Sequence, residues 1–344
     1  MAEQAERRLT VIVGAGASYD CGLNSQTNPG FRPPLAKHLF ENRSPHFTDI
    51  LREYPGAENL ADEIRGGVNR GINLETILRK FQESNNEGTL RDYRQVPLYL
   101  QHLLGEVSSF YIMSGGTAFN TLVRALDASV FSKILYLTVN YDLFLEQAIS
   151  RHYRIEFTSM DSYFPKDANW SLVKLHGSVQ WGREILNGNG RPGNPIALVD
   201  SLHGPLRLGE LEFLNGYKGS VRARGTQFMY PALAVPVDGK DEFVCDPSHS
   251  DAAKNFLERC TDFLILGFSG LDTHVLNLLK GVSCVNSLTV VNEGNQGAID
   301  TINRIVAVNP VFRQMPAHYP AAGFGNFIRE GHFDNFLELM KTVS

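Results

Sequence analysis

A glycine-rich turn near the start of the chain has the composition of an anion-binding site. Residues 9–18 read Leu-Thr-Val-Ile-Val-Gly-Ala-Gly-Ala-Ser, an apolar β-branched run followed by two glycines and a serine. The run predicts a buried strand that leads into a helix N-terminus, where backbone N–H groups collect an anion such as a nucleotide phosphate. A turn that only has to bend can have the same residues. The dinucleotide fingerprint of dehydrogenases is incomplete, because Tyr19 occupies the third glycine position, and this disfavours hydride transfer.

Four further clusters of polar residues or glycine follow apolar runs that predict buried strands. The clusters are Thr138-Val-Asn140-Tyr-Asp142, Lys174-Leu-His176-Gly-Ser178, Gly267-Phe-Ser269-Gly-Leu-Asp272 and Asn292-Glu293. Parallel strands end at one edge of a sheet, and α/β proteins bind ligands at that edge. The five clusters therefore predict a single site at the carboxyl ends of the strands.

The elements that must position these clusters alternate between strand and helix. Apolar runs at 133–138, 172–175, 263–267 and 288–291 predict buried strands, and 154–158 is a further strand candidate. Helices are predicted after several of them, including 273–280, and an amphipathic helix closes the chain around 333–340. This order predicts an α/β fold with a doubly wound, mostly parallel, Rossmann-like sheet. Residues 182–225, rich in Gly, Asn and Pro, show no clear periodicity and predict an irregular loop or a small subdomain.

A helical segment interrupts this alternation. Between 35 and 130 the apolar residues recur at helical spacing, most clearly at 35–40, 73–81 and 96–112. We therefore expect residues 1–34 and 131–344 to form the Rossmann-like domain and residues 35–130 to form a helical insertion subdomain. A chain of 344 residues is long enough for such an elaboration of one main core.

The overall composition is that of an ordinary globular protein, with 43% hydrophobic and 20% charged residues. The net charge of −5 gives no general attraction to nucleic acid. The four cysteines lie far apart in sequence, which argues against a structural zinc site and indicates free thiols in a reducing compartment. Neither a signal peptide nor a membrane span is apparent, so we expect a cytoplasmic protein.

Taken together, these motifs resemble those of the sirtuin, or SIR2-like, family. The resemblance rests on Gly-Ala-Gly-Ala-Ser at 14–18, Thr-x-Asn-Tyr-Asp at 138–142, Leu-His-Gly-Ser at 175–178, Leu-Gly-Phe-Ser at 266–269 and Val-Asn at 291–292. They occur in the family's order across about 280 of the 344 residues. The resemblance implies a sirtuin-type fold with NAD as a substrate.

Departures from the deacylating sirtuins indicate a different branch. Those enzymes carry a zinc module with two close cysteine pairs, which this chain lacks, so no metal site is expected. The loop before Phe31 and Arg32 is longer than in those enzymes, which leaves the roles of these two residues open. The helical insertion and the missing zinc module resemble bacterial SIR2-like proteins of anti-phage defence. That resemblance implies cleavage of NAD in an infected cell, homo-oligomerisation, and a possible partner such as a HerA-like ring ATPase.

Two of these residues have the chemistry that cleavage of the nicotinamide–ribose bond requires. Nicotinamide leaves as a neutral molecule, so the site must mainly stabilise an oxocarbenium-like ribose and activate a nucleophile. His176 can take a proton from water or a ribose hydroxyl near neutral pH. Asn140 can orient the same group without adding charge beside the cationic ring. The structural alternatives are a histidine that caps a strand end and an asparagine that caps a helix.

The remaining site residues are assigned through the resemblance. Asp142 would accept a hydrogen bond from the nicotinamide carboxamide, or would serve only as a first-turn carboxylate of a helix. The groups expected to bind the rest of NAD are Ala15, Gly16 and Ser18 at the pyrophosphate, Gly267 and Ser269 on the adenosine side, and Asn292 at the adenosine ribose. Thr138 is also expected to contact NAD. Each of the turn residues among them has a purely structural alternative.

The leading hypothesis is an NAD glycohydrolase that produces nicotinamide and ADP-ribose, acting as the toxic effector of an abortive-infection system. One alternative is an NAD-dependent protein deacylase. Another is a non-catalytic subunit that senses NAD or ADP-ribose.

Overall fold

The computed structural model describes most of the chain. The described residues are 6–22, 31–41, 44–72, 74–187, 195–204, 206–214, 229–234, 245–313 and 323–342. None of the helices in these residues combines the length and the apolar composition that a membrane-spanning segment needs.

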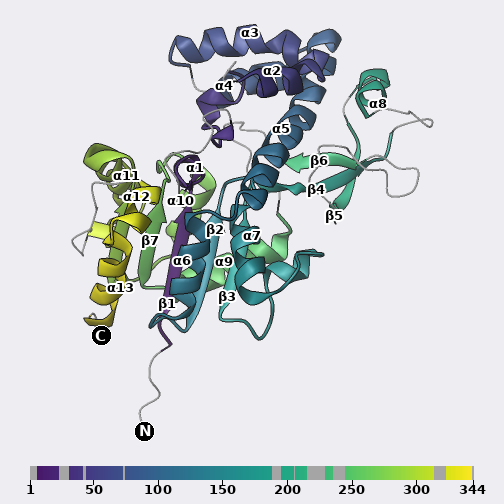
Figure 1. Ribbon diagram of the computed structural model, residues 1–344. Helices are drawn as coiled ribbons and strands as arrows, with labels where there is room; N and C mark the ends of the chain where they lie inside the picture. Colours follow the sequence, from purple (N-terminus) through teal and green to yellow (C-terminus); the bar gives the residue numbers. More distant parts are fainter. Residues whose placement is uncertain are drawn as a thin grey trace.

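A five-stranded parallel sheet forms the centre of the molecule (Figure 1). Its strands lie in the order β3-β2-β1-β7-β8, and every neighbouring pair is parallel. The strands are β1 (Arg8–Val13), β2 (Lys133–Thr138), β3 (Trp170–Lys174), β7 (Asp262–Leu266) and β8 (Ser287–Val291). Nearly all of their side chains are buried, as expected for β-branched and apolar runs covered on both faces. The predicted α/β fold with a doubly wound sheet is confirmed.

The five strands end at the same level. Thr138 is the register partner of both Val13 and Lys174, Val13 is also the partner of Leu266, and Leu266 is the partner of Val291. Because these are the last residues of the five strands, the segments that follow them all begin at one edge of the sheet. The shared edge that the sequence predicted is therefore present.

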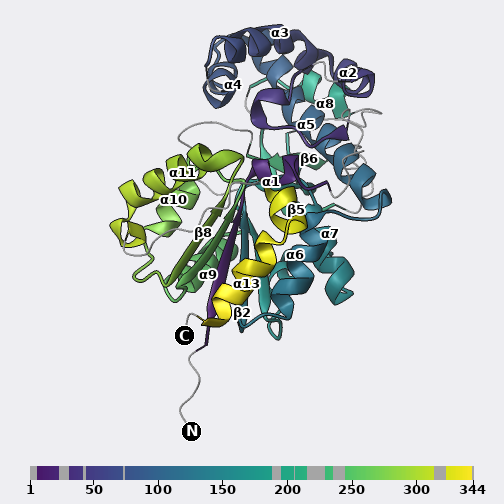
Figure 2. The same ribbon diagram turned by 60° about the vertical axis from the view of Figure 1, so that its left-hand side comes forward.

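Helices cover both faces of the sheet (Figure 2). One face carries α6 (Ala118–Asp127), α7 (Phe144–Tyr153), α12 (Phe324–Arg329) and α13 (His332–Thr342), and the other carries α9 (Pro247–Leu257), α10 (Thr273–Leu279) and α11 (Gly294–Val308). A sheet that is sandwiched in this way buries both sides of each strand. This arrangement explains why the strands were recognisable as continuous apolar runs.

Asp127, the last residue of α6, connects that helix to its neighbours. Its carboxylate lies 2.9 Å from His152 Nε2 and accepts hydrogen bonds from Tyr153 and Asn169, both at 2.9 Å. Burial alone would raise the pKa of Asp127, but these three contacts outweigh it and lower the pKa below its usual value.

Helices α2 (Pro45–Arg52), α3 (Pro55–Asn69) and α4 (Leu74–Gln82) lie beyond the carboxyl edge, at the top of Figure 1. The long α5 (Glu87–Met113) runs from them down toward the central sheet. They pack on one another, with α3 against both α4 and α5. In contrast, α6 packs on α7 and α12 at the sheet. Residue 73, the first residue of the predicted helical run 73–81, lies outside the described residues.

A second, antiparallel sheet lies beside α5. It has the order β5-β4-β6 and consists of β4 (Gly177–Ile185), β5 (Leu208–Phe213) and β6 (Met229–Leu233), with α8 (Pro195–Ser201) between β4 and β5. The sequence predicted an irregular loop or a small subdomain at 182–225, and the described part of that range contributes to this small sheet and to α8, in keeping with the second alternative. The register of β4 shifts against both partners, and glycine at 182 weakens the strand pattern.

The strand predicted at 154–158 is also absent from this described stretch. Arg154 follows α7 with φ 57°, a left-handed conformation that ends the helix. The residues after it form a loop that leads to the short 3-10 helix η3 (Met160–Tyr163).

Candidate active site

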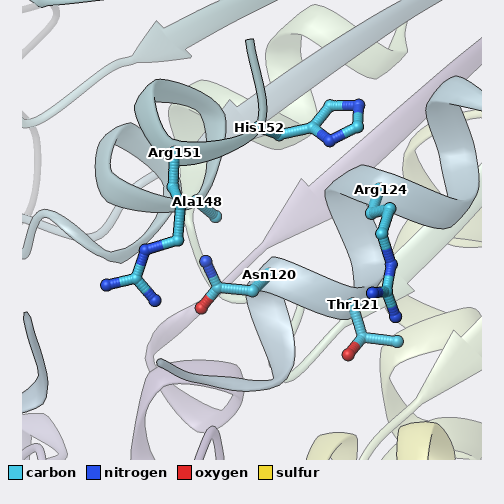
Figure 3. Close-up of a pocket in the computed structure, with 6 residues that line it drawn as sticks. All are labelled: Asn120, Thr121, Arg124, Ala148, Arg151 and His152. Atoms are coloured by element: carbon cyan, nitrogen blue, oxygen red, sulfur yellow. The ribbon is translucent and has the colours of Figure 1, made fainter. Parts of the chain in front are cut away.

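One cavity of about 260 Å³ lies between α6 and α7 (Figure 3). It is lined by Asn120, Thr121, Arg124, Ala148, Arg151 and His152. None of these is a predicted site residue. The predicted residues gather instead at the carboxyl edge of the central sheet.

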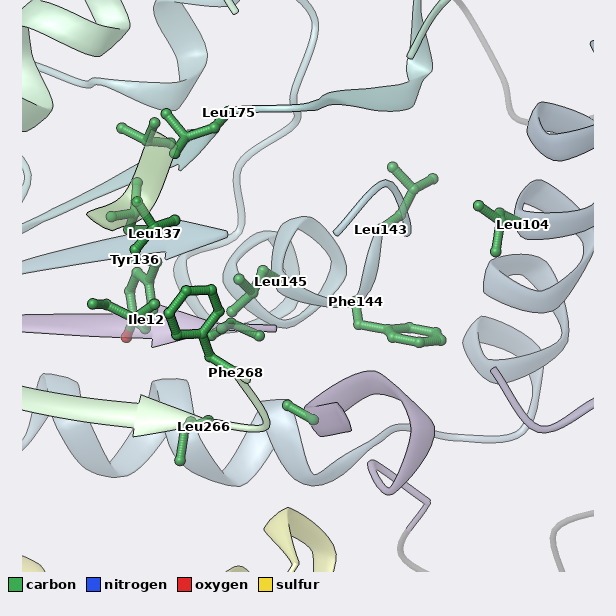
Figure 4. Close-up of a cluster of buried hydrophobic side chains, with 14 of the residues drawn as sticks. Ile12, Leu104, Tyr136, Leu137, Leu143, Phe144, Leu145, Leu175, Leu266 and Phe268 are labelled. Carbon is green, nitrogen blue, oxygen red and sulfur yellow. The ribbon is translucent and has the colours of Figure 1, made fainter. Parts of the chain in front are cut away.

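A cluster of buried apolar side chains lies directly beneath that edge of the sheet (Figure 4). Ile12, Leu137 and Leu266, from three adjacent strands, are at most 1% exposed. Close packing of these side chains holds in place the strand ends from which the loops of the candidate site project.

Asn140 joins the loop after β2 to the glycine turn after β1. The residue is 8% exposed, and its Nδ2 donates to the Gly14 carbonyl at 3.0 Å and to Ser18 Oγ at 2.9 Å. Both amide hydrogens are therefore used inside the protein. In the described part of the chain nothing donates to Asn140 Oδ1, so the side chain can offer a ligand only an acceptor.

Ser18 and Asp142 continue this network. Ser18 Oγ donates to Asp142 Oδ2 at 2.6 Å, and Asp142 Oδ1 accepts from the Phe144 N–H in the first turn of α7 at 3.2 Å. Burial raises the pKa of Asp142, and the nearby Lys174 ammonium and these hydrogen bonds offset the effect only in part. Asp142 therefore makes a hydrogen bond at the start of a helix, which was the structural alternative to its predicted contact with the nicotinamide carboxamide. Thr138, also expected near the ligand, donates its hydroxyl to the Val13 carbonyl at 3.0 Å.

A buried ion pair connects the end of β3 to α7. Lys174 Nζ lies 2.8 Å from Glu146 Oε1, and the two side chains are only 1% and 4% exposed. Lys174 also donates to the Asp142 carbonyl, while Glu146 accepts from Tyr163 and Ser178. Burial raises the pKa of Glu146, and Lys174 opposes that shift. This pair was not predictable from the sequence, since no local pattern relates two charges on separate elements.

His176, Asp272 and His274 form a second group, which we call the His–Asp–His cluster. His176 Nε2 lies 3.0 Å from Asp272 Oδ2, and the rings of His176 and His274 are nearly perpendicular with centroids 5.4 Å apart. Asp272 also caps α10, because its Oδ1 accepts from the Val275 N–H at 2.9 Å. Burial alone would raise the pKa of Asp272, but the two histidines and this hydrogen bond outweigh it and lower the pKa. The role of Asp272 was not predictable from the sequence, and no sequence motif singled out His274.

The glycine turn is packed directly against the loop after β7. The Gly14 N–H donates to the Leu266 carbonyl at 2.9 Å, and the Gly16 N–H donates to the Gly267 carbonyl at 3.0 Å. A Cβ on Gly267 would lie 1.9 Å from the Ala17 nitrogen, and Gly267 has φ 57°. The Gly16 N–H, expected to face the pyrophosphate, is therefore occupied by the protein in this arrangement, whereas Ala15 is exposed.

The last two predicted residues lie at the ends of β7 and β8. Ser269 is exposed, and its carbonyl accepts from Arg304 at 2.6 Å. Asn292 is half-buried, and its Nδ2 donates to Thr301 at 2.9 Å and to the Phe268 carbonyl at 3.0 Å. Asn292 thus connects the two loops, and its amide hydrogens are directed into the protein.

Phe31 and Arg32 pack beside the glycine turn. The Phe31 ring stacks on Phe110 with a centroid distance of 4.3 Å. The Arg32 guanidinium lies 3.6 Å from the centre of the Tyr19 ring and donates to the Tyr19 carbonyl at 2.9 Å. These contacts connect the segment after the lengthened loop to α1 (Ala15–Tyr19) and α5.

Comparison with known families identifies the segment that contains most of this site. Residues 134–288 match the family model described as the SIR2-like domain. This segment is similar to the SIR2-like domain. It includes Thr138, Asn140, Asp142 and His176, together with the loop after β7. The glycine turn and Asn292 lie outside the matched residues of the SIR2-like domain but at the same edge of the sheet.

Solved structures also resemble the chain at low identity. They include Sir2 in complex with the inhibitor EX-527, 2'-O-acetyl-ADP-ribose and deacetylated p53 peptide, with 12% identity, a TM-score of 0.40, and coverage of 96% of this chain and 94% of that chain. Another, on the structural basis of sirtuin substrate affinity, has 12% identity, a TM-score of 0.41, and coverage of 96% and 95%. A third, on the mechanism and regulation of Sir2 enzymes, has 13% identity, a TM-score of 0.44, and coverage of 98% and 94%. No curated protein matched the chain by sequence.

Proposed function

We propose that this protein hydrolyses NAD to nicotinamide and ADP-ribose. The observation that carries the proposal is the placement of Asn140 and His176. Each lies two residues beyond the level ends of adjacent strands, β2 and β3, within the SIR2-like domain. An amide that presents only its oxygen and an imidazole with a carboxylate neighbour are the two groups that activation of a hydroxyl nucleophile requires.

The reaction divides into bond cleavage and capture of the ribose. The nicotinamide–ribose C–N bond breaks with its electron pair going to nicotinamide, which leaves as a neutral molecule. Water then attacks the oxocarbenium-like carbon, and its proton passes to His176. The Asn140 Oδ1 would accept a hydrogen bond from this water or from a ribose hydroxyl. Asp272 would stabilise the positive charge that His176 acquires, since its carboxylate lies 3.0 Å from the ring.

The first test is whether the purified protein releases nicotinamide from NAD, with nicotinamide measured by chromatography. His176→Ala should abolish the release, while His332→Ala should leave it unchanged, because His332 lies on α13 with its side chain 37% exposed. Thermal unfolding of both variants verifies that they are folded. Release that survives in folded His176→Ala protein would reject the assignment of His176.

The same assay separates the alternatives. A deacylase would release nicotinamide faster when an acyl-lysine peptide is added and would yield the deacylated peptide, whereas a hydrolase needs no peptide. A sensor subunit would bind NAD in calorimetry without turning it over.

We extend the proposal to the biological setting. Depletion of NAD would make the protein a toxic effector in anti-phage defence, acting as a homo-oligomer or with a partner such as a HerA-like ATPase. This part rests on the motif resemblance to defence proteins. Expression in bacteria challenged with phage, with and without the neighbouring gene product, tests it through cellular NAD levels.

A further inference from the structure

The His–Asp–His cluster contains more potential metal ligands than the proposed chemistry uses. His176, Asp272 and His274 each offer one ligand atom, and these three atoms all lie within 4.8 Å of one another. His274 has no part in the proposed hydrolysis. Two imidazoles with one carboxylate are a common ligand set of zinc sites that retain an open coordination position.

The cluster comes from two loops at the carboxyl edge. His176 follows β3, whereas Asp272 and His274 stand at the start of α10, separated by one residue. Asp272 is fixed by the Val275 N–H on one oxygen, so its other oxygen faces His176. Ligating carboxylates in metal sites are commonly held by such a hydrogen bond.

The contact between His176 and Asp272 leaves the ring nitrogen available. Nε2 is buried, lies only 3.0 Å from the carboxylate oxygen, and has no aligned hydrogen-bond partner among the described residues. Tetrahedral zinc with bonds of about 2.0–2.1 Å holds its ligand atoms about 3.3 Å apart. The His176–Asp272 separation is already close to this value, and a rotation of the His274 side chain would complete the set.

We propose that His176, Asp272 and His274 form a Zn²⁺ site whose occupation switches off NAD cleavage. A neutral imidazole has one lone pair, and a bound metal uses it while the other ring nitrogen keeps its proton. Zinc-bound His176 therefore has no nitrogen left that can accept a proton from the nucleophile. The inhibitory consequence rests on the proposed function, whereas zinc binding does not.

Calorimetry with ZnCl₂ on EDTA-treated, desalted protein tests the site itself. We expect one Zn²⁺ per chain, and no binding of MgCl₂, which prefers oxygen ligands. His274→Ala removes a direct ligand and should weaken zinc binding by more than about 100-fold, above the 10–100-fold typical of losing a supporting residue. The matched control is His152→Ala, since His152 also pairs with a carboxylate, Asp127, at 2.9 Å. Absence of zinc binding, or equal binding by wild type and His274→Ala, would overturn the site.

Two further measurements test the consequence for His176. Saturating Zn²⁺ should protect His176 from modification by diethylpyrocarbonate, detected by mass spectrometry, whether or not the protein cleaves NAD. In the nicotinamide assay, Zn²⁺ should inhibit wild type at least tenfold with recovery in EDTA, and His274→Ala should resist. Modification of His176 at its metal-free rate in the presence of Zn²⁺, or undiminished cleavage, would refute the switch. Zinc binding without any NAD cleavage by metal-free wild type would instead contradict the proposed function alone.

Discussion

Lys174→Met should destabilise the protein strongly because it leaves a charge buried without a partner. The Lys174 and Glu146 side chains are 1% and 4% exposed, and their ion pair spans 2.8 Å. Removing one partner of such a pair costs about 3–5 kcal/mol. Unfolding entropy of about 2.1 cal/mol/K per residue over 344 residues gives about 0.7 kcal/mol/K, so the melting temperature should fall by about 4–7 °C.

The assay is thermal and urea unfolding of a double-mutant cycle. Lys174→Met with Glu146→Gln removes both charges, so the double variant should recover much of the loss. Lys254→Met is the matched control: its ammonium lies 3.4 Å from Asp251, but both side chains are more than half exposed, and its effect should be at most about 1 kcal/mol. A loss below about 1 kcal/mol for Lys174→Met, or a double variant no more stable than the single one, would refute the reasoning.

Three other predictions follow from contacts described above. Gly267→Ala should reduce both stability and nicotinamide release, because its Cβ would lie 1.9 Å from the Ala17 nitrogen. Gly281→Ala is the control and should change little in the same unfolding and release assays, because the atom nearest to its Cβ would be 3.6 Å away. Asn140→Asp should lower nicotinamide release at least tenfold and cost about 1–3 kcal/mol in urea unfolding, because two hydrogen bonds donated by the amide are lost; wild-type release would contradict this. The pKa of Asp127 is lowered in the native state, so its contribution to stability is present above its unfolded pKa near 4 and disappears as the pH falls through the native value. Urea midpoints of wild type and Asp127→Asn from pH 7 to pH 3 should therefore converge on acidification, and a gap independent of pH would count against this account.

The central sheet was predictable from sequence because burial on both faces demands continuous apolar runs. The predicted strand at 133–138 has the bounds of β2, and the runs at 263–267 and 288–291 lie within a residue of β7 and β8. Glycines and polar residues immediately after these runs indicated the edge at which they gather. The antiparallel sheet was missed because its strands are irregular in register and separated by long connections.

The location of the candidate site was predictable from the sequence, whereas its contacts were less so. Asn140 and His176 occupy the expected edge, but the groups that hold them come from distant parts of the chain. Glu146 and Lys174 are 28 residues apart, and Asp272 follows His176 by 96 residues. Periodicity describes neighbours on one element, so it gives no information about such pairings. Similarly, the hydrogen bond from the Gly16 N–H to the Gly267 carbonyl depends on how closely the loops after β1 and β7 approach, which the sequence does not reveal.

The close approach of the glycine turn to the loop after β7 also limits which residues can replace its glycines during evolution. A methyl group on Gly14 or on Gly16 would lie within 2.9 Å of the Gly267 carbonyl oxygen, and one on Gly267 would collide with the opposite turn. A substitution of any of the three glycines therefore places a side chain against the backbone of the facing loop. Lineages that keep this backbone should retain all three glycines together, and those that have replaced one should show compensating changes in the length of the facing loop.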